Sequence, residues 1–220
     1  MVPPVVIRGV TVDVVSKFKY LGSMLSSTND LRVEVSHRIS RAAHAFHMLG
    51  PVIQDSRLRL RVKCRVYQAV VLNVLVYGLE TCCLLASDAR RLEVFNMRCV
   101  RSMLGGCCPM GLTNASILRH CRLPSVDLLL RRSRMRWLGH IGRMAFTRVP
   151  KLLVFAGLEG PRPRGGSHKP WSQLVAGEVA HVASVHAKWP VAYGWCQWEG
   201  ACQDKVAWRR VIKAMSELGG

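Results

Sequence analysis

The chain has 220 residues, half of them hydrophobic, and it carries 32 lysines and arginines against 13 acidic residues. A chain of this size buries about 70% of its unfolded surface, and the hydrophobic content excludes wholesale disorder. The formal net charge of +19 is far more than solubility requires, and it indicates a polyanionic partner. Nucleic acid is the first candidate, including a ribosome-like assembly, and an anionic membrane surface is the second.

The sequence contains no convincing targeting segment. The first residues, Met1 to Pro4, lack the charged start of a signal peptide, and Arg8 and Gly9 interrupt the apolar run behind them. The longest apolar stretch, Val66 to Ala86, contains polar residues such as Glu80. We interpret it as a buried helix followed by a turn and not as a membrane span. We therefore expect a nuclear or cytoplasmic protein that is neither secreted nor bound in a membrane.

The chain has nine cysteines, an odd number, which without a secretory signal predicts reduced thiols. A zinc site is the alternative interpretation, because five possible ligands occur in the middle of the chain. They are Cys99, Cys107, Cys108, His120 and Cys121, and their spacing fits no established zinc pattern. We therefore favour buried or incidental thiols and expect no metal.

The N-terminal residues 1–27 predict a small antiparallel β-meander. Val5-Val6-Ile7 and Val10-Thr11-Val12 are β-branched runs that flank Arg8-Gly9, where glycine can take the positive φ of a tight turn. Residues 18–25 are expected to form the third strand. The rest of the chain is predicted to be mainly α-helical.

Residues 28–106 predict a helical bundle. Asn29 and Asp30 offer N-cap chemistry for a helix that runs to about residue 49, and Gly50-Pro51 is expected to end it. The arginines of this helix, Arg38 among them, are predicted to lie away from its apolar face. A third helix of the bundle is expected from Ser87 to about Leu104.

Between these two, Ser56 is expected to cap a helix over residues 57–77. Its predicted inward face carries Leu58, Val62, Val66, Ala69 or Val70, Asn73 and Tyr77. Arginines repeat every four residues on the other side: Arg57, Arg61 and Arg65. Three arginines at this spacing repel one another unless something anionic lies opposite. They either solubilise an apolar helix or bind phosphates.

Residues 107–157 predict further basic helices, a short one from Thr113 or Asn114 to Cys121 and a longer one that Ser125 caps. The longer helix, to Met144, is predicted to turn an apolar stripe inward: Val126, Leu130, Trp137, Ile141 and Met144. Beside it runs a cationic stripe: Arg132, Arg136, His140 and Arg143. A solvated basic face and a nucleic-acid contact are the two interpretations. Residues 148–155 are expected to form one more short helix.

Residues 158–170 form a basic linker rich in proline and glycine. Its cations include Arg162, Arg164 and Lys169, and the linker is either a cationic strap for phosphates or a spacer. Residues 171–220 predict a small C-terminal helical unit, with helices over 171–185 and 199–217. Its tryptophans, Trp195, Trp198 and Trp208, could stack on bases, and we favour packing instead.

No catalytic constellation is recognisable. A polymerase needs paired carboxylates to hold two divalent metals, and the six aspartates of this chain are scattered with no YxDD-like pair. A P-loop, a GxSxG elbow and an HExxH helix are also absent from the sequence. We expect no catalytic residue, no metal ligand and no small-molecule substrate for this chain.

Several phrases resemble, in the same order, the C-terminal portion of reverse transcriptases of non-LTR (LINE-type) retrotransposons, particularly the endonuclease-encoding kinds. They lie at residues 18–23 (FKYLGS), 66–81, 90–105, 123–125 (LPS), 136–144 (RWLGHIGRM) and 148–151 (RVPK). The segment 107–111 departs from the polar sequence usual in the family. The similarity is weak after Trp171.

The resemblance implies that Lys19, Tyr20, Leu21 and Gly22 are a primer grip, which holds the 3′ end of the primer. It implies that residues 28–106 are a thumb that follows the template–primer duplex, and that residues 107–157 are a post-polymerase region. The family keeps its catalytic aspartates before the primer grip. We therefore expect a fragment of an RNA-directed DNA polymerase that is inactive alone, with Mg²⁺ required only by the polymerase core that this chain lacks.

Two further interpretations stay open. The chain could be a stand-alone nucleic-acid-binding protein derived from a retroelement, or a decayed copy with no activity. The expected partner is a nucleic acid, the duplex of RNA template and DNA primer.

Overall fold

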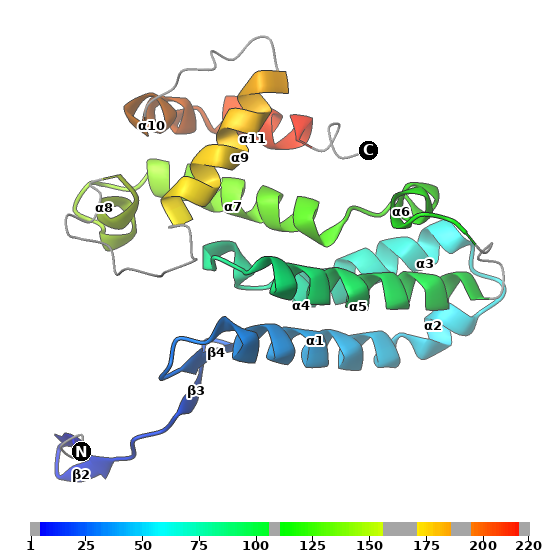
Figure 1. Cartoon of the computed structure of the whole chain (residues 1–220), viewed down its shortest axis with the longest axis horizontal. Coiled ribbons are helices and arrows are strands. Elements are labelled where there is room, and N and C mark those ends of the chain that lie inside the picture. Colours follow the sequence, from blue (N-terminus) through cyan, green and yellow to red (C-terminus); the bar gives the residue numbers. More distant parts are fainter. Residues whose placement is uncertain (1–4, 106–110, 156–170, 186–194, 216–220) are drawn as a thin grey trace.

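The computed structural model describes residues 5–105, 111–155, 171–185 and 195–215. These residues are mostly helical, with short antiparallel strands at the N-terminus, so the predicted fold class is confirmed. Figure 1 shows the helices in layers: α1 at one edge, then α3, α4 and α5, then α6 and α7, and finally α9, α10 and α11. The first strands stand apart from the helices (Figure 1).

The strands form two separate hairpins and not the predicted three-stranded meander. The first hairpin pairs β1 (Val5–Ile7) with β2 (Val10–Val12), and the second pairs β3 (Lys17–Tyr20) with β4 (Ser23–Ser26). In the second hairpin Leu21 and Gly22 both have positive φ, +48° and +87°, as a two-residue type I′ turn requires. This turn folds residues 18–25, predicted as one strand, back on themselves.

Helix α1 (Leu31–Met48) begins where the sequence predicts, because the Asp30 side chain accepts a hydrogen bond from the backbone N–H of Arg32 at 3.0 Å. It ends before Gly50-Pro51, as expected. The same two residues also begin the short helix α2 (Gly50–Gln54), because proline is tolerated in a first helical turn. The prediction missed this second role.

The helix predicted over residues 57–77 is three pieces. They are α3 (Leu60–Tyr67), the π-helical segment η1 (Gln68–Leu72) and α4 (Asn73–Val76). Arg59, without a side-chain cap, precedes α3, so the predicted cap at Ser56 is wrong. Asp55 instead accepts hydrogen bonds from the backbone and side chain of Arg57, which forms a turn before the helix.

The buried side of this helix differs from the predicted one already in α3, before the π-helical segment begins. The buried residues are Cys64, Tyr67, Val71, Leu72, Leu75 and Val76. Val62, Val70 and Tyr77, which the regular period predicts to be inward, are exposed.

The remaining central helices agree with the sequence. Helix α5 (Ala86–Leu104) buries Leu92, Cys99 and Met103, and it follows the short 3₁₀ turn η2 (Leu79–Thr81). Thr113 caps α6 (Asn114–Cys121). Ser125 caps α7 (Val126–Gly142), with its hydroxyl oxygen 3.2 Å from the backbone nitrogen of Leu128.

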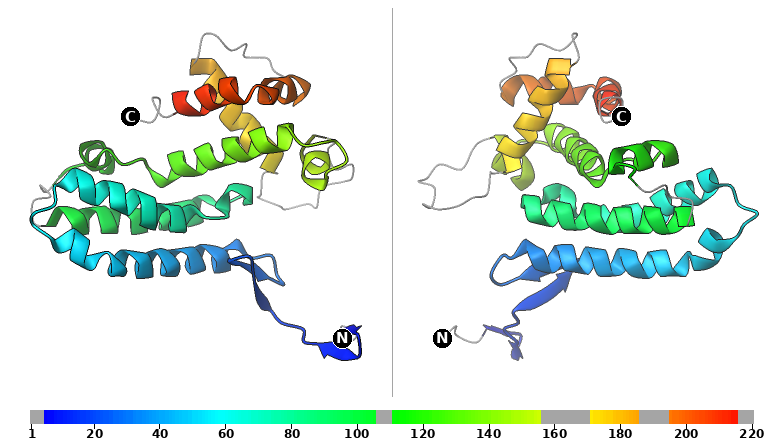
Figure 2. Two further views of the ribbon diagram at one scale, coloured as in Figure 1. Left: turned by 180° about the vertical axis from the view of Figure 1, so that it is seen from behind. Right: turned by 45° about the vertical axis from the view of Figure 1, so that its right-hand side comes forward.

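Helix α7 connects two hydrophobic cores. Its first half contributes Val126 and Leu130 to a core that α1, α3, α4, α5 and α6 share. Its second half contributes Met135 and Leu138 to a core with α9 (Trp171–Val185), α10 (Trp195–Gln203) and α11 (Lys205–Ala214). The short helix α8 (Val149–Phe155) packs beside α7. Figure 2 shows α7 lying between the two groups of helices.

The C-terminal helix predicted over residues 199–217 is interrupted at Asp204. The Asp204 side chain accepts hydrogen bonds from the backbone N–H groups of Val206 and Ala207, at 2.8 and 3.0 Å, and so begins α11. Residues before it belong to α10. The sequence prediction overlooked this internal N-cap.

The apolar stretch at residues 66–86 changes direction at Gly78, whose φ is +76°. Among the described residues, no helix is both long enough and apolar enough to cross a bilayer. Within the same residues, no three His, Cys, Asp or Glu side chains gather to hold a metal ion. Cys107 and Cys108 of the considered zinc set lie outside the described residues.

Three buried thiols should be unreactive in the folded protein. Burial raises the pKa of Cys64 and Cys202 to about 12 and that of Cys99 to about 11. Because the thiolate is the reactive form, we expect these cysteines to resist a maleimide at about pH 8 and to react once the chain is unfolded. Mass spectrometry of the labelled peptides measures this. Equal labelling rates for Cys64 in folded and denatured protein would contradict its burial.

Candidate nucleic-acid interface

Most acidic side chains of the described residues have a partner within the chain. Six form ion pairs: Glu34–Arg38, Asp55–Arg57, Asp88–Arg91, Asp127–Arg131, Glu178–Arg134 and Glu199–Lys151. Asp30 and Asp204 cap helices, and Glu93 accepts a hydrogen bond from the first N–H of α7 at 2.8 Å. Few carboxylates are left to neutralise the exposed arginines and lysines.

The cationic stripe of α7 divides into two parts. Arg136 and His140 are exposed, and Arg132 beside them is half-buried. Arg143 instead points at the neighbouring helix, where its Nη1 donates to the carbonyl oxygen of Cys202 at 2.8 Å. Arg143 therefore fastens α10 to α7, and its membership of the ligand-binding row stays a prediction.

Arg132 is the unusual member of the row. Its Nε is buried and has no hydrogen-bond partner in the described part of the chain. Burial lowers the pKa of this guanidinium, and the positive charge of Arg136 lowers it further. A partly desolvated cation beside a like charge is unfavourable unless an anion approaches. The pair Arg132 and Arg136 therefore has the electrostatics of a phosphate contact.

Trp137 and His140 lie together next to this pair, with ring centroids 5.4 Å apart. Trp137 was predicted to face inward with Val126, Leu130 and Ile141. Those three are buried, whereas Trp137 is half-buried. Its ring thus lies at the border between the packed and the basic sides of α7.

The glycines of the RWLGHIGRM phrase have a packing role that the sequence analysis missed. A Cβ on Gly139 would lie 2.2 Å from Nε1 of Trp208, and a Cβ on Gly142 would lie 2.6 Å from Cβ of Cys202. The Trp208 indole donates to the carbonyl oxygen of Met135 at 2.8 Å. The two glycines thus form the docking surface of α10 and α11. Glycine inside a helix costs about 1 kcal/mol relative to alanine, which was the available signal.

Two buried cations fasten the same region. Nε of Arg134 donates to Oε1 of Glu178 at 2.8 Å, which joins α7 to α9. Nζ of Lys151 donates to the carbonyl oxygens of Gly142 and Met144 at 3.0 and 2.9 Å. Lys151 therefore caps the C-terminal end of α7. Neither side chain is available to a ligand.

The arginine row predicted beside Ser56 is shorter in the structure. Helix α3 begins at Leu60, so Arg57 lies before the helix and pairs with Asp55 at 2.9 Å. Arg61 and Arg65 are exposed on α3, and neither forms an ion pair with another described residue. Two of the three predicted arginines, Arg61 and Arg65, thus lie on one helix, in the layer next to α7 (Figure 1).

The predicted primer grip lies at the tip of the β3–β4 hairpin. The side chains of Lys19, Tyr20 and Leu21 are exposed, Leu21 by 77%. Gly22 is instead the anchored residue: its carbonyl oxygen accepts a hydrogen bond from the Arg38 guanidinium. The grip residues are therefore brought together at one tip, with three side chains outward and Gly22 facing the helices.

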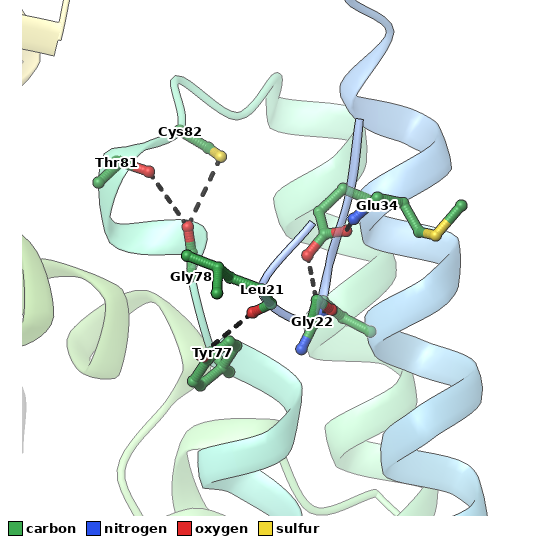
Figure 3. Close-up of polar contacts among 9 residues, drawn as sticks. Leu21, Gly22, Glu34, Tyr77, Gly78, Thr81 and Cys82 are labelled. Atoms are coloured by element: carbon green, nitrogen blue, oxygen red, sulfur yellow. Dashed lines mark hydrogen bonds and ion pairs between the residues drawn. The ribbon is translucent and has the colours of Figure 1, made fainter. Parts of the chain in front are cut away.

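The hairpin is fastened to the bundle by α1 and by the end of α4 (Figure 3). Glu34 accepts hydrogen bonds from the backbone of Met24 and from Arg38, and the Tyr77 hydroxyl donates to the Leu21 carbonyl oxygen at 3.4 Å. Arg38 also lies 5.2 Å from the centroid of the Tyr77 ring. Arg38 is buried, so the prediction that it lies away from the packed face is wrong.

The turn that follows Tyr77 is hydrogen-bonded as well. The Gly78 carbonyl oxygen accepts from the Thr81 hydroxyl at 3.2 Å and from the Cys82 thiol at 3.8 Å (Figure 3). A Cβ on Gly78 would lie 2.9 Å from Oγ of Ser23. The hairpin and this turn therefore fit closely only with glycine at position 78.

The cations of the basic linker, Arg162, Arg164 and Lys169, lie outside the described residues, as do the side chains of Trp195 and Trp198. Trp208 is 2% exposed and packs in the C-terminal core. No protein-family model, curated protein or solved structure matches this chain.

Proposed function

We propose that this chain binds the sugar–phosphate backbone of a template–primer duplex as part of a non-LTR retrotransposon reverse transcriptase. The observation that carries the proposal is the unneutralised basic surface. Arg61, Arg65 and Arg136 are exposed without an acidic partner among the described residues, and Arg132 has a buried, unpartnered Nε. The resemblance of the sequence motifs to reverse transcriptases indicates that the nucleic acid is a template–primer duplex.

Such a surface suits phosphate recognition without base readout. Contacts from arginine to phosphate fix the position of a duplex but carry no sequence information, which is what a polymerase thumb requires. The exposed tip at Lys19, Tyr20 and Leu21 would hold the primer end. The basic linker with Arg162, Arg164 and Lys169 would add further phosphate contacts.

The proposal assigns no catalytic residue and no metal to this chain. Mg²⁺ would be bound by the polymerase core, and this chain alone would polymerise nothing. Its place would be the nucleus or the cytoplasm, where retroelement RNA and DNA meet.

The N-terminal hairpins favour a part of a polymerase over a stand-alone nucleic-acid-binding protein. Apolar side chains there are exposed: Val6, Ile7, Val12, Val14, Val15, Phe18, Leu21 and Leu25. A group of exposed apolar side chains of this size is typical of a surface that packs against another part of a protein. In the proposed function that part is the palm.

The first test removes the positive charges of Arg132 and Arg136 on α7. We expect Arg132→Gln with Arg136→Gln to weaken binding to a labelled RNA–DNA hybrid duplex about tenfold, to a similar extent for unrelated sequences. The slope of log affinity against log salt, measured by fluorescence anisotropy, should become shallower by about 1 to 2 because each duplex phosphate contact contributes about 0.9.

The matched control removes two exposed arginines from α1, Arg32→Gln with Arg41→Gln. This control lowers the net charge equally but leaves α7 unchanged, so it should keep most of the slope. An α7 variant that binds as tightly as the control would show that the basic face of α7 is merely solvated.

A further inference from the structure

The exposed side of α11 is a second basic surface. Trp208, Val211 and Ile212 are buried on the inner side of this helix. Lys205, Arg209 and Lys213 follow one another at intervals of four residues on the outer side, with Arg210 beside them, and all four side chains are exposed. We call these four residues the α11 basic face. Its length from Lys205 to Lys213 is about 12 Å, at 1.5 Å per helical residue.

No carboxylate of the described residues forms an ion pair with this face. None of the four cations forms an ion pair with another described residue. The nearest acid in sequence, Asp204, is engaged at the start of the helix: hydrogen bonds from the backbone N–H groups of Ala207 and Val206 lower its pKa, and the charge of Arg210 adds to this. Like charges four residues apart on a helix repel one another, so an anion on this face would stabilise it.

The α11 basic face and the basic row of α7 lie on two helices that pack against each other. Trp208 of α11 contacts Gly139 and Met135 of α7. Arg209 is the residue after Trp208, so it is turned by about 100° around α11 from the contact. Arg136 and His140 are likewise the residues after Met135 and Gly139 on α7. Both basic surfaces therefore border the same α7–α11 contact, which the glycines of the RWLGHIGRM phrase keep short.

We propose that the α11 basic face is a second binding surface for the phosphate backbone of nucleic acid. This inference rests on the proposed nucleic-acid binding and extends it to the C-terminal unit, where the sequence indicated only packing. A duplex carries about one negative charge per 1.7 Å of its axis, so a row of about 12 Å meets several phosphates. Exposed cations without an apolar anchor suffice for such binding.

A membrane surface fits α11 less well. A helix that binds a bilayer inserts its apolar side below the headgroups, and the apolar side of α11 is buried in the C-terminal core. Within α11, all of whose residues are described, Val206 is the one large apolar side chain that is exposed. Protein partners likewise need apolar or aromatic anchors at the centre of an interface.

The test uses the full chain with Lys205→Gln, Arg209→Gln and Lys213→Gln together. The probe is the labelled RNA–DNA hybrid duplex, titrated at salt concentrations from about 50 to about 200 mM. We expect the affinity to fall at least tenfold and the salt slope to become shallower by about 2 to 3. Circular dichroism and the thermal midpoint should stay unchanged, because all three side chains are exposed.

Two further variants serve as controls for this test. Arg32→Gln, Arg41→Gln and Arg90→Gln remove the same charge from exposed positions of α1 and α5, and this control should keep most of the slope. Lys205→Arg, Arg209→Lys and Lys213→Arg keep the charge of the α11 basic face, and this variant should bind like the unaltered chain because phosphate contacts need only a cation.

The outcomes separate this inference from the proposed function. If the α11 neutral variant binds like the charge-matched control while Arg132→Gln with Arg136→Gln weakens binding, the inference is overturned and the proposed function stands. An unaltered chain that binds no duplex overturns both. Unchanged duplex binding together with lost binding to phosphatidylserine vesicles would assign the face to a membrane surface and would also overturn the inference.

Discussion

Gly139→Ala is expected to detach the C-terminal helices from α7. The new methyl group would lie 2.2 Å from Nε1 of Trp208, so the indole must leave its place and lose its hydrogen bond to Met135. Removing a buried tryptophan from a core costs about 3 to 5 kcal/mol. Alanine returns about 1 kcal/mol through its better helix propensity. We expect a net loss of about 2 to 4 kcal/mol in the free energy of unfolding of the C-terminal core, measured by urea titration of tryptophan fluorescence.

Gly177→Ala is the matched control for this prediction. Gly177 lies in α9, and a Cβ there would meet no atom within 4 Å. The same chemical change should therefore stabilise the protein by up to about 1 kcal/mol. If Gly139→Ala and Gly177→Ala have the same effect, the close contact between α7 and α11 does not exist as described.

Arg38→Met is expected to destabilise strongly the core that α1 shares with α3, α4, α5 and α6. Arg38 and Glu34 form an ion pair with side chains 5% exposed, and the Arg38 guanidinium also binds the Gly22 carbonyl oxygen. Methionine would leave the Glu34 carboxylate buried without its cation, which costs about 3 to 5 kcal/mol. The measurement is the free energy of unfolding from denaturant titration, with hydrogen exchange of the β3–β4 amides as a local reading.

The comparison for Arg38 is Arg57→Met. Arg57 also pairs with an acid, but its side chain is 87% exposed, and exposed ion pairs contribute little. This variant should unfold like the unaltered chain. The double variant Glu34→Leu with Arg38→Met should recover part of the loss, because the unpaired charge is gone. Equal stabilities for Arg38→Met and Arg57→Met would contradict the buried ion pair.

Three helix starts were predictable because their signals are local. Asp30, Thr113 and Ser125 each cap the helix that the sequence assigns to them, through hydrogen bonds to backbone groups two or three residues away. The π-helical segment at residues 68–72 was not predictable from the regular period. The buried side of this helix was also missed, because Val62 and Cys64 are both suitable for a core, and only the fold shows that Cys64 is buried and Val62 exposed.

Cations were harder to assign than helices. A four-residue spacing correctly predicted that Arg61, Arg65 and Arg136 are exposed, but it could not identify the arginines that fasten one helix to another. The partner of Arg134 is 44 residues away and that of Arg143 is 59 residues away, so only the fold reveals them. The cations of the α11 basic face lie within the predicted last helix, for which the sequence analysis considered the packing side chains alone.

Binding of the unaltered chain to a labelled RNA–DNA hybrid duplex, measured over a range of salt concentrations, tests the central claim most directly. The basic pairs on α3 and α7 and the α11 basic face predict that log affinity falls linearly with log salt, with a slope of about −4 or steeper. Two hybrids of unrelated sequence should bind with similar affinity. Absent binding, or binding that does not respond to salt, would contradict the phosphate contacts from which the function is inferred.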